Sequence, residues 1–264
     1  MNFRVIKRFL IFTFLLFTFL FIGVVSFIFR RNKIEKLKRE FIASVIHNLN
    51  IKISKYGKEI DNNVVGVYMS NHRSYLDPIV ILNYVNATPV VKRSVKYWPI
   101  VGWCISISNA IWVKRSSPYS KSTTKREVVN RVKNKESVLI FPEGTTHLFD
   151  RTIGFKKGIF KECAKNNFQI IPISINYQIK EDAWISNDNF IRHFFQCFSK
   201  EETHIGIYFH DPIKSNNETF LYDWTLHEIN FGMMYIKNSF EGQLLPQETD
   251  FVYFLQKSSI GATA

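Results

Sequence analysis

Two short strings carry the residue types that could do chemistry in this 264-residue chain. Residues 71–77 read Asn-His-Arg-Ser-Tyr-Leu-Asp, and residues 141–145 read Phe-Pro-Glu-Gly-Thr. The imidazole of His72 can take a proton from an alcohol and return it, because its proton affinity lies close to neutral pH. The carboxylate of Asp77, five positions later, can accept a hydrogen bond from one ring nitrogen and leave the other nitrogen free as the base.

The chemistry of this pair depends on the source of the nucleophile. The pair suits acyl transfer to a lipid alcohol. No serine or cysteine stands beside the pair in a nucleophile-elbow pattern, so we expect the hydroxyl of the accepting alcohol itself to attack, without an acyl-enzyme intermediate. The alternative is that Asp77 only caps a helix, since it precedes Pro78 and the apolar run at residues 79–82. The sequence leaves both interpretations open.

Both strings are expected to follow buried strands, which we predict at residues 64–69 and 137–141. In open α/β sheets, sites form at the carboxyl ends of the strands, so the two strings should lie at that edge. Helix-like and strand-like segments alternate along the rest of the chain, which predicts an α/β fold with a mostly parallel sheet flanked by helices. The further helices are expected at residues 78–84, 119–133 and 156–166, and the further strands at residues 110–113, 169–176 and 205–209.

With these strings in view, the chain resembles the glycerolipid acyltransferases, typified by 1-acylglycerol-3-phosphate acyltransferase. The resemblance covers residues 61–213 and consists of four blocks in order. The blocks are His72 and Asp77 separated by four residues, a strand ending in arginine at residues 110–115, Phe-Pro-Glu-Gly-Thr at residues 141–145 with Phe-Lys-Lys-Gly at residues 155–158, and an apolar strand with a proline at residues 170–175.

The resemblance implies an O-acyltransferase that moves a fatty acyl group from a thioester, acyl-coenzyme A or acyl carrier protein, to the free hydroxyl of a lysolipid. His72 would be the general base and Asp77 its orienting partner. Backbone N–H groups around Gly144 are candidates to stabilise the oxyanion. Arg115 would hold the phosphate of the acceptor, a role that suits a guanidinium. The full set of candidate substrate-binding residues is Arg115, Glu143, Gly144, Thr145, Lys156 and Lys157.

One departure from the family pattern affects the acceptor. The family's third block commonly ends in arginine, but this chain has Thr146 there. The acceptor is therefore either 1-acylglycerol 3-phosphate, giving phosphatidate for phospholipid synthesis, or another lysophospholipid or lyso-aminolipid. Two other classes stay open: an inactive relative that binds lipid, and a hydrolase of acyl thioesters. His147, next to this block, is expected to be a bystander.

The N-terminus carries a candidate membrane anchor. Residues 9–29 hold no charge, and their 21 residues match the roughly 20 needed to span hydrocarbon. The run is longer than the apolar core of a secretory signal, about 7–15 residues, so we expect an uncleaved transmembrane helix. Six cations at residues 30–39 against three at residues 4–8 place the catalytic domain on the cytoplasmic side.

A second segment, residues 34–49, has apolar residues at helical spacing. The amphipathic helix lies either on the bilayer surface or against the core of the domain, and its cationic flanks favour lipid. The first 60 residues hold twelve Lys or Arg and three Glu, which is +9 of the net charge of +13. This concentration of charge predicts anionic lipid headgroups as the partner, and no nucleic-acid signature is present.

These observations divide the chain into an anchor at residues 1–31, an amphipathic helix and linker at 32–60, the catalytic domain at 61–213 and a C-terminal extension at 214–264 that packs on it. The extension is expected to hold a helix at residues 223–240 and a frayed end at 257–264. Cys104, Cys163 and Cys197 are too few and too scattered for a disulfide scaffold or a metal site, so we expect reduced core residues and no bound cofactor.

Overall fold

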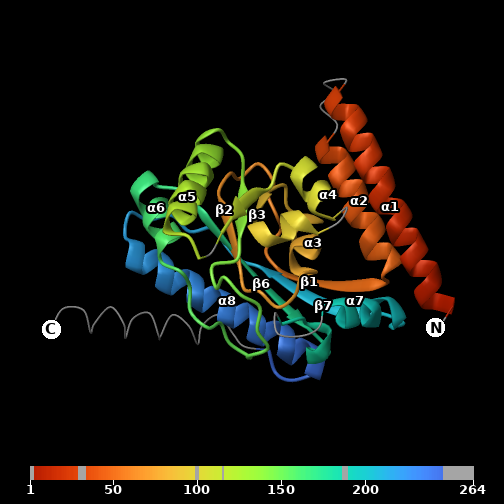
Figure 1. Cartoon of the computed structure of the whole chain (residues 1–264). Helices are drawn as coiled ribbons and strands as arrows, with labels where there is room; N and C mark the ends of the chain where they lie inside the picture. The colour runs from red at the N-terminus through yellow and green to blue at the C-terminus, as the bar shows by residue number, and fades with distance from the viewer. Residues whose placement is uncertain (1–2, 29–33, 99–100, 115, 186–189, 246–264) are drawn as a thin grey trace.

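The computed structural model describes residues 3–28, 34–98, 101–114, 116–185 and 190–245. A seven-stranded sheet runs through the molecule in the order β1-β7-β6-β2-β5-β3-β4 (Figure 1). All neighbouring strands are parallel except β6 and β7, which are antiparallel. The strands are β1 Ile51–Gly57, β2 Val67–Ser70, β3 Thr88–Lys92, β4 Ile111–Val113, β5 Val138–Ile140, β6 Ile170–Tyr177 and β7 Thr203–Phe209. The predicted α/β fold with a mostly parallel sheet is confirmed.

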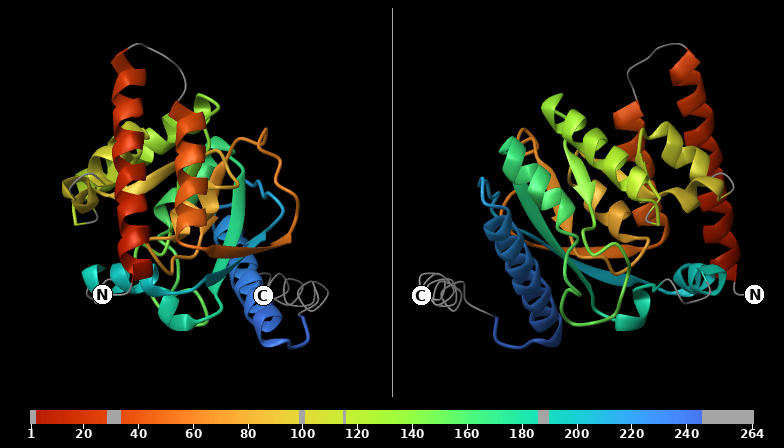
Figure 2. Two further views of the ribbon diagram at one scale, coloured as in Figure 1. Left: turned by 90° about the vertical axis from the view of Figure 1, so that its right-hand side faces the viewer. Right: turned by 60° about the vertical axis from the view of Figure 1, so that its left-hand side comes forward.

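Helices cover both faces of this sheet (Figure 2). They are α1 Phe3–Ile28, α2 Ile34–Asn48, α3 Asp77–Leu82, α4 Val101–Ile107, α5 Pro118–Lys133, α6 Gly158–Asn166, α7 Phe190–Ser199 and α8 Glu218–Glu241, with short 3-10 turns η1 Arg93–Tyr97 and η2 Lys180–Asp182. The helices α2 and α3 pack on one face, whereas α5, α6 and α8 pack on the other.

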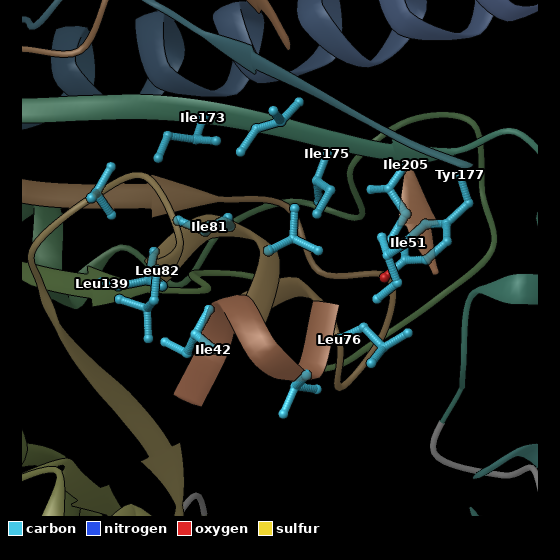
Figure 3. Packing of buried hydrophobic residues seen from close by; sticks show 14 of the residues in the cluster. Ile42, Ile51, Leu76, Ile81, Leu82, Leu139, Ile173, Ile175, Tyr177 and Ile205 are labelled. Atoms are coloured by element: carbon cyan, nitrogen blue, oxygen red, sulfur yellow. The ribbon is translucent and has the colours of Figure 1, made fainter. Parts of the chain in front are cut away.

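The core is split by the sheet because successive side chains of a strand point to opposite faces. In β2, Tyr68 belongs to the cluster under α2 and α3, while Val67 and Met69 belong to the cluster under α5, α6 and α8. Figure 3 shows the first cluster, in which Ile173 and Ile175 of β6 point toward the same side. These fully buried strands explain why the central part of the sequence reads as short apolar runs rather than alternating ones.

Two parts of the predicted domain division need correction. The segment assigned to helix and linker, residues 32–60, also contains β1, which pairs with β7 and so belongs to the sheet. In α2, Ile42 and Val45 are buried in the same core cluster as Tyr68, so this apolar stripe packs on the domain, which favours the second of the two alternatives. The contact of α2 with lipid stays a prediction.

The long N-terminal helix lies against the domain along much of its length. At its start, the guanidinium of Arg8 donates to the carbonyls of Phe198, Lys200 and Glu201 at the end of α7. Toward its end, a Cβ added at Gly23 would lie 2.8 Å from Cγ2 of Ile107 in α4. The outer face is apolar and open, with Phe14 69% and Phe21 70% exposed. Residues 3–26 are long and apolar enough to cross a membrane, and the crossing itself stays a prediction.

The C-terminal extension contributes α8, which includes the predicted helix at residues 223–240. This helix approaches the sheet closely: a Cβ at Gly232 would lie 2.4 Å from Oγ of Ser174 in β6. The predicted frayed end at residues 257–264 lies outside the described residues.

Candidate active site

The turn that follows β2 carries the pair that was predicted to be catalytic. Asn71 fixes the start of this turn, because its side-chain amide donates to the carbonyl of Ile175 and accepts from the N–H of Ile175, both at 2.9 Å. His72 follows, and its Nδ1 lies 2.8 Å from Oδ2 of Asp77. The predicted pair is thus assembled at the carboxyl end of β2.

The carboxylate of Asp77 serves the turn rather than the helix it begins. Its Oδ2 also accepts from the N–H groups of Arg73 at 2.6 Å and Ser74 at 2.8 Å, both of which precede it. The N-cap position of α3 is Leu76, and no side chain caps this helix. The interpretation of Asp77 as a helix cap alone is therefore wrong.

This geometry fixes the protonation of the imidazole. An ionised carboxylate only accepts hydrogen bonds, so Nδ1 of His72 carries the proton and Nε2 is left with its lone pair. The ring stacks on Phe141 with 4.2 Å between ring centroids, and the side chain is 14% exposed. His72 is therefore held through Nδ1 while part of its side chain stays exposed, which suits a general base.

A tyrosine completes the environment of the aspartate. The hydroxyl of Tyr177, in β6, donates to Oδ1 of Asp77 at 2.7 Å. Burial, together with the neighbouring carboxylate, holds the pKa of Tyr177 well above its ordinary value, so the hydroxyl keeps its proton. The sequence alone did not identify Tyr177, because it is separated from Asp77 by 100 residues and carries no motif.

Glu143 holds the backbone of His72. Its Oε2 accepts from the N–H of His72 at 2.7 Å, while Oε1 accepts from Nε2 of His147 at 2.6 Å and from the N–H of Ile153 at 3.2 Å. The side chain is fully buried. Because both oxygens already face protein donors, Glu143 shapes the site from behind, and we find no free oxygen through which it would bind a substrate.

His147 is part of this support, although the sequence predicted a bystander. The N–H of Phe149 donates to Nδ1 of His147 at 3.2 Å, so Nδ1 must be the unprotonated nitrogen. The proton then lies on Nε2, which donates to Glu143. The backbone of His147 also contacts the first string, since its N–H donates to the carbonyl of His72 at 3.4 Å. The only hint in the sequence was its spacing of four residues from Glu143.

The turn after β5 offers backbone donors on the two residues that follow Gly144. Gly144 has a φ of +75°, which favours glycine, and its N–H is used by the carbonyl of Phe141 at 3.1 Å. Within the described residues, the N–H groups of Thr145 and Thr146 make no hydrogen bond. The oxyanion donors expected around Gly144 are thus better sought at the two threonines.

The structure separates the two candidate lysines. Lys156 lies over the turn, since a Cβ added at Gly144 would lie 3.8 Å from its Cε. The ammonium of Lys157 instead lies 5.5 Å from the ring centroid of Tyr222 in α8, a cation–π contact. Arg115, the predicted phosphate ligand, lies outside the described residues.

A second histidine cluster resembles a nucleophilic triad but is closed to substrate. His210 lies 2.8 Å from Oγ of Ser174 through Nε2 and 2.8 Å from Glu228 through Nδ1. Ser174 is fully buried under α8, and its hydroxyl donates to the carbonyl of Ile229 at 2.9 Å. This cluster fastens α8 to the sheet, so the acceptor hydroxyl stays the expected nucleophile.

Thiols and carboxylates elsewhere give no further chemistry. Cys104, Cys163 and Cys197 are free and buried, and burial raises the pKa of Cys104 to about 11 and that of Cys163 to about 12. Among the described residues, no group of three or more His, Cys, Asp or Glu side chains could hold a metal ion.

Known proteins are similar to the part of the chain that carries these residues. A family model described as "Acyltransferase" matches residues 52–176, which include His72, Asp77 and Glu143. Residues 52–176 thus match the acyltransferase family, and this part of the chain is similar to the glycerolipid acyltransferases. A chloroplastic 1-acyl-sn-glycerol-3-phosphate acyltransferase of Arabidopsis thaliana is 34% identical over 110 residues, 41% of this chain and 31% of the relative.

Two other members of the glycerolipid acyltransferase family bear on sequence and fold. A 1-acyl-sn-glycerol-3-phosphate acyltransferase of Saccharomyces cerevisiae is 31% identical over 116 residues, 42% of this chain and 38% of the relative. The crystal structure of a 1-acyl-sn-glycerophosphate acyltransferase from Thermotoga maritima superposes with a TM-score of 0.64, over 87% of this chain and 98% of that one, at 20% identity. The matched stretch spans about a third of the length of the first curated relatives.

Proposed function

We propose that the chain is a membrane-associated O-acyltransferase that moves a fatty acyl group from an acyl thioester to the free hydroxyl of a lysolipid, 1-acylglycerol 3-phosphate in the first instance. The observation that carries this proposal is the His72–Asp77 pair at 2.8 Å, in which Nδ1 is held by the carboxylate and, among the described residues, Nε2 makes no hydrogen bond. The names of the relatives support this acceptor class.

The reaction would proceed in one attack. Nε2 of His72 accepts the hydroxyl proton as the acceptor oxygen forms a bond to the thioester carbonyl carbon. The N–H groups of Thr145 and Thr146 are candidates to stabilise the resulting oxyanion. Collapse restores the carbonyl and breaks the carbon–sulfur bond, and the departing thiolate takes the proton back from His72. No acyl-enzyme forms, and no cofactor is needed beyond acyl-coenzyme A or acyl carrier protein as the donor.

Asp77 stabilises the positive charge that forms on His72 during proton transfer. As His72 takes a proton, the imidazolium forms within 2.8 Å of a carboxylate held by three other donors. A charge-assisted hydrogen bond is about twice as strong as a neutral one, so the transition state gains more from this contact than the ground state does. The chain thus supplies both orientation and charge at the base.

In this proposal the membrane supplies the lysolipid acceptor. The open apolar face of α1, where Phe14 and Phe21 are more than two-thirds exposed, is suited to contact acyl chains. We propose that this helix anchors the enzyme and that the catalytic domain faces the cytoplasm, where acyl donors are available. The cations at both flanks of the helix support an anionic membrane surface as the partner.

The acceptor is tested with a panel. Detergent-purified protein is given a labelled acyl donor together with lysophosphatidate, lysophosphatidylethanolamine, lysophosphatidylglycerol, a lyso-aminolipid or glycerol 3-phosphate, and the lipid products are resolved. A diacyl product with one acceptor identifies the substrate. In the His72→Ala variant, turnover should fall by about 10²–10⁴, the usual contribution of a general base. Normal turnover in folded His72→Ala protein would contradict the mechanism, and thiol release that needs no lysolipid would indicate a hydrolase.

A further inference from the structure

A buried guanidinium beside the catalytic histidine has almost no partners. Arg73 is 3% exposed, yet among the described residues it makes one side-chain hydrogen bond, from Nη1 to the carbonyl of His147 at 3.3 Å. Its Nε is buried without any partner. A guanidinium is always charged and carries five N–H donors in a planar fork. The carboxylates of Glu143, Asp77 and Asp150 act on this charge, but among the described residues none of them hydrogen-bonds to it, so most donors of the fork are open to oxygen atoms of a ligand.

A cavity of about 200 Å³ lies beside this side chain. Its lining includes Arg73, Leu148 and Tyr177, so it touches the catalytic turn, the loop after β5 and the end of β6. Pockets for drug-sized ligands are larger, about 300–1,000 Å³. The cavity is therefore of a size for a headgroup or a small ion rather than for an acyl chain.

The charges around the cavity add two more cations. Lys180 of η2 and Lys237 of α8 line it, and their ammonium groups lie 3.4 Å and 2.9 Å from the carboxylate oxygens of Asp150. Glu241 also lines the cavity, so the lining itself holds three cations and two carboxylates, and Asp77 and Glu143 act on Arg73 from the side of the turn after β2. Because the pairs with Asp150 are exposed, they are weak and the lysines can turn to a stronger anion.

We propose that this cavity binds a phosphate-class oxyanion, gripped by Arg73 and flanked by Lys180 and Lys237. The bound oxygens would fill the unused donors of the guanidinium fork, a geometry that suits phosphate. Since Tyr177 both lines the cavity and holds Asp77, the anion lies directly behind the catalytic pair. The phosphate belongs either to the lysolipid headgroup, which rests on the proposed function, or to free inorganic phosphate, which does not.

Binding is measured first, without turnover. Inorganic phosphate is titrated into the detergent-purified full chain by isothermal calorimetry. The Lys180→Gln/Lys237→Gln variant should bind about tenfold more weakly, about threefold for each exposed lysine. The matched control is Lys161→Gln/Lys165→Gln, two exposed lysines on α6 away from the cavity, and it should bind as the parent does.

A substitution of Asp150 is expected to change the phosphate affinity in the opposite direction. Asp150→Asn removes a carboxylate that competes for both lysines, so phosphate should bind about threefold more tightly. A merely structural role of the lysine–aspartate contacts would make this variant weaker or neutral. Absence of phosphate binding would overturn the proposal. Phosphate binding that neither cavity variant changes would show that the ion binds elsewhere and would overturn it as well.

Kinetics then separate the two sources. If the site takes the headgroup, inorganic phosphate competes with lysophosphatidate, and the double lysine variant raises KM with kcat unchanged. If the site takes the free ion, phosphate still binds in the presence of saturating lysophosphatidate, and KM does not change. Both outcomes support the site. If no acceptor turns over but the calorimetric changes hold, the proposed function fails while the anion site stands.

Discussion

Replacing Asp77 by asparagine tests how the carboxylate acts on the catalytic histidine. In the parent, Oδ2 accepts from Nδ1 of His72 and from two backbone N–H groups, and Oδ1 accepts from the hydroxyl of Tyr177. An asparagine has one carbonyl oxygen and one NH₂ group. The oxygen should take the Oδ2 position, because the NH₂ there would face three donors. The NH₂ then faces the oxygen of Tyr177, which can accept, so His72 keeps its proton on Nδ1.

The expected loss follows from this orientation. The variant keeps the tautomer and loses only the charge that stabilises the imidazolium. Hydrogen bonds to charged groups contribute about 1.5–3 kcal/mol against about 1 kcal/mol for neutral ones, so the loss is about 0.5–2 kcal/mol. At about 1.4 kcal/mol per factor of ten, kcat/KM should fall by about 2- to 30-fold. In the Ser-His-Asp triad the corresponding change selects the wrong tautomer and lowers kcat by about 10⁴.

The assay is the initial rate of labelled acyl transfer to the acceptor that the panel identifies, over a range of acceptor concentrations. Circular dichroism and thermal melting confirm that Asp77→Asn protein is folded, and Asp77→Ala, which orphans all four donors, serves as the disruptive comparison. A fall near 10⁴ in folded Asp77→Asn protein would refute the orientation argued from the donors. Unchanged kcat/KM would refute the stabilisation of the imidazolium by the charge of Asp77.

Three further substitutions test the supports around this pair. His147→Leu should lower kcat by about tenfold because Glu143 is held less firmly, a loss of about 1.4 kcal/mol that is typical of one hydrogen bond to a charged group. His147→Gln keeps a donor and should recover most of this loss. Equal activity of the two variants would contradict the role of His147 in holding Glu143. Tyr177→Phe leaves a buried oxygen of the catalytic aspartate unsatisfied and should cost about 1–3 kcal/mol in urea unfolding, so an unchanged midpoint would count against that bond. Gly232→Ala places a Cβ 2.4 Å from Oγ of Ser174 and should destabilise by about 1–3 kcal/mol; a melting temperature equal to that of the parent would show that α8 shifts freely.

The catalytic pair was predictable because its geometry is local. His72 and Asp77 are five residues apart on one turn, and the apolar run before them marks a strand that ends where the turn begins. The strand and helix alternation likewise follows from short apolar segments, since the central strands are buried on both faces. These features need no knowledge of distant contacts.

The elements that the sequence missed lack such a signal. The strand β1, Ile51–Gly57, is half exposed and rich in lysine, and β3 contains Pro89, so neither reads as a buried strand. For α2, an apolar stripe does not say what covers it, and the core of the domain covers Ile42 and Val45. The partners of Glu143 depend on the direction of backbone N–H groups, which only the fold determines.

The two buried carboxylates of Asp77 and Glu143 both position His72. Asp77 holds the ring of His72 and Glu143 holds its backbone N–H, so both strings of the sequence converge on the same residue from different strands. Neither carboxylate has an oxygen left for the acceptor. Recognition must then come from other groups, among which are the N–H groups near Thr146, the ammonium of Lys156 and the anion site at Arg73. A change at Thr146, where the family commonly has arginine, can therefore alter the acceptor without disturbing the base.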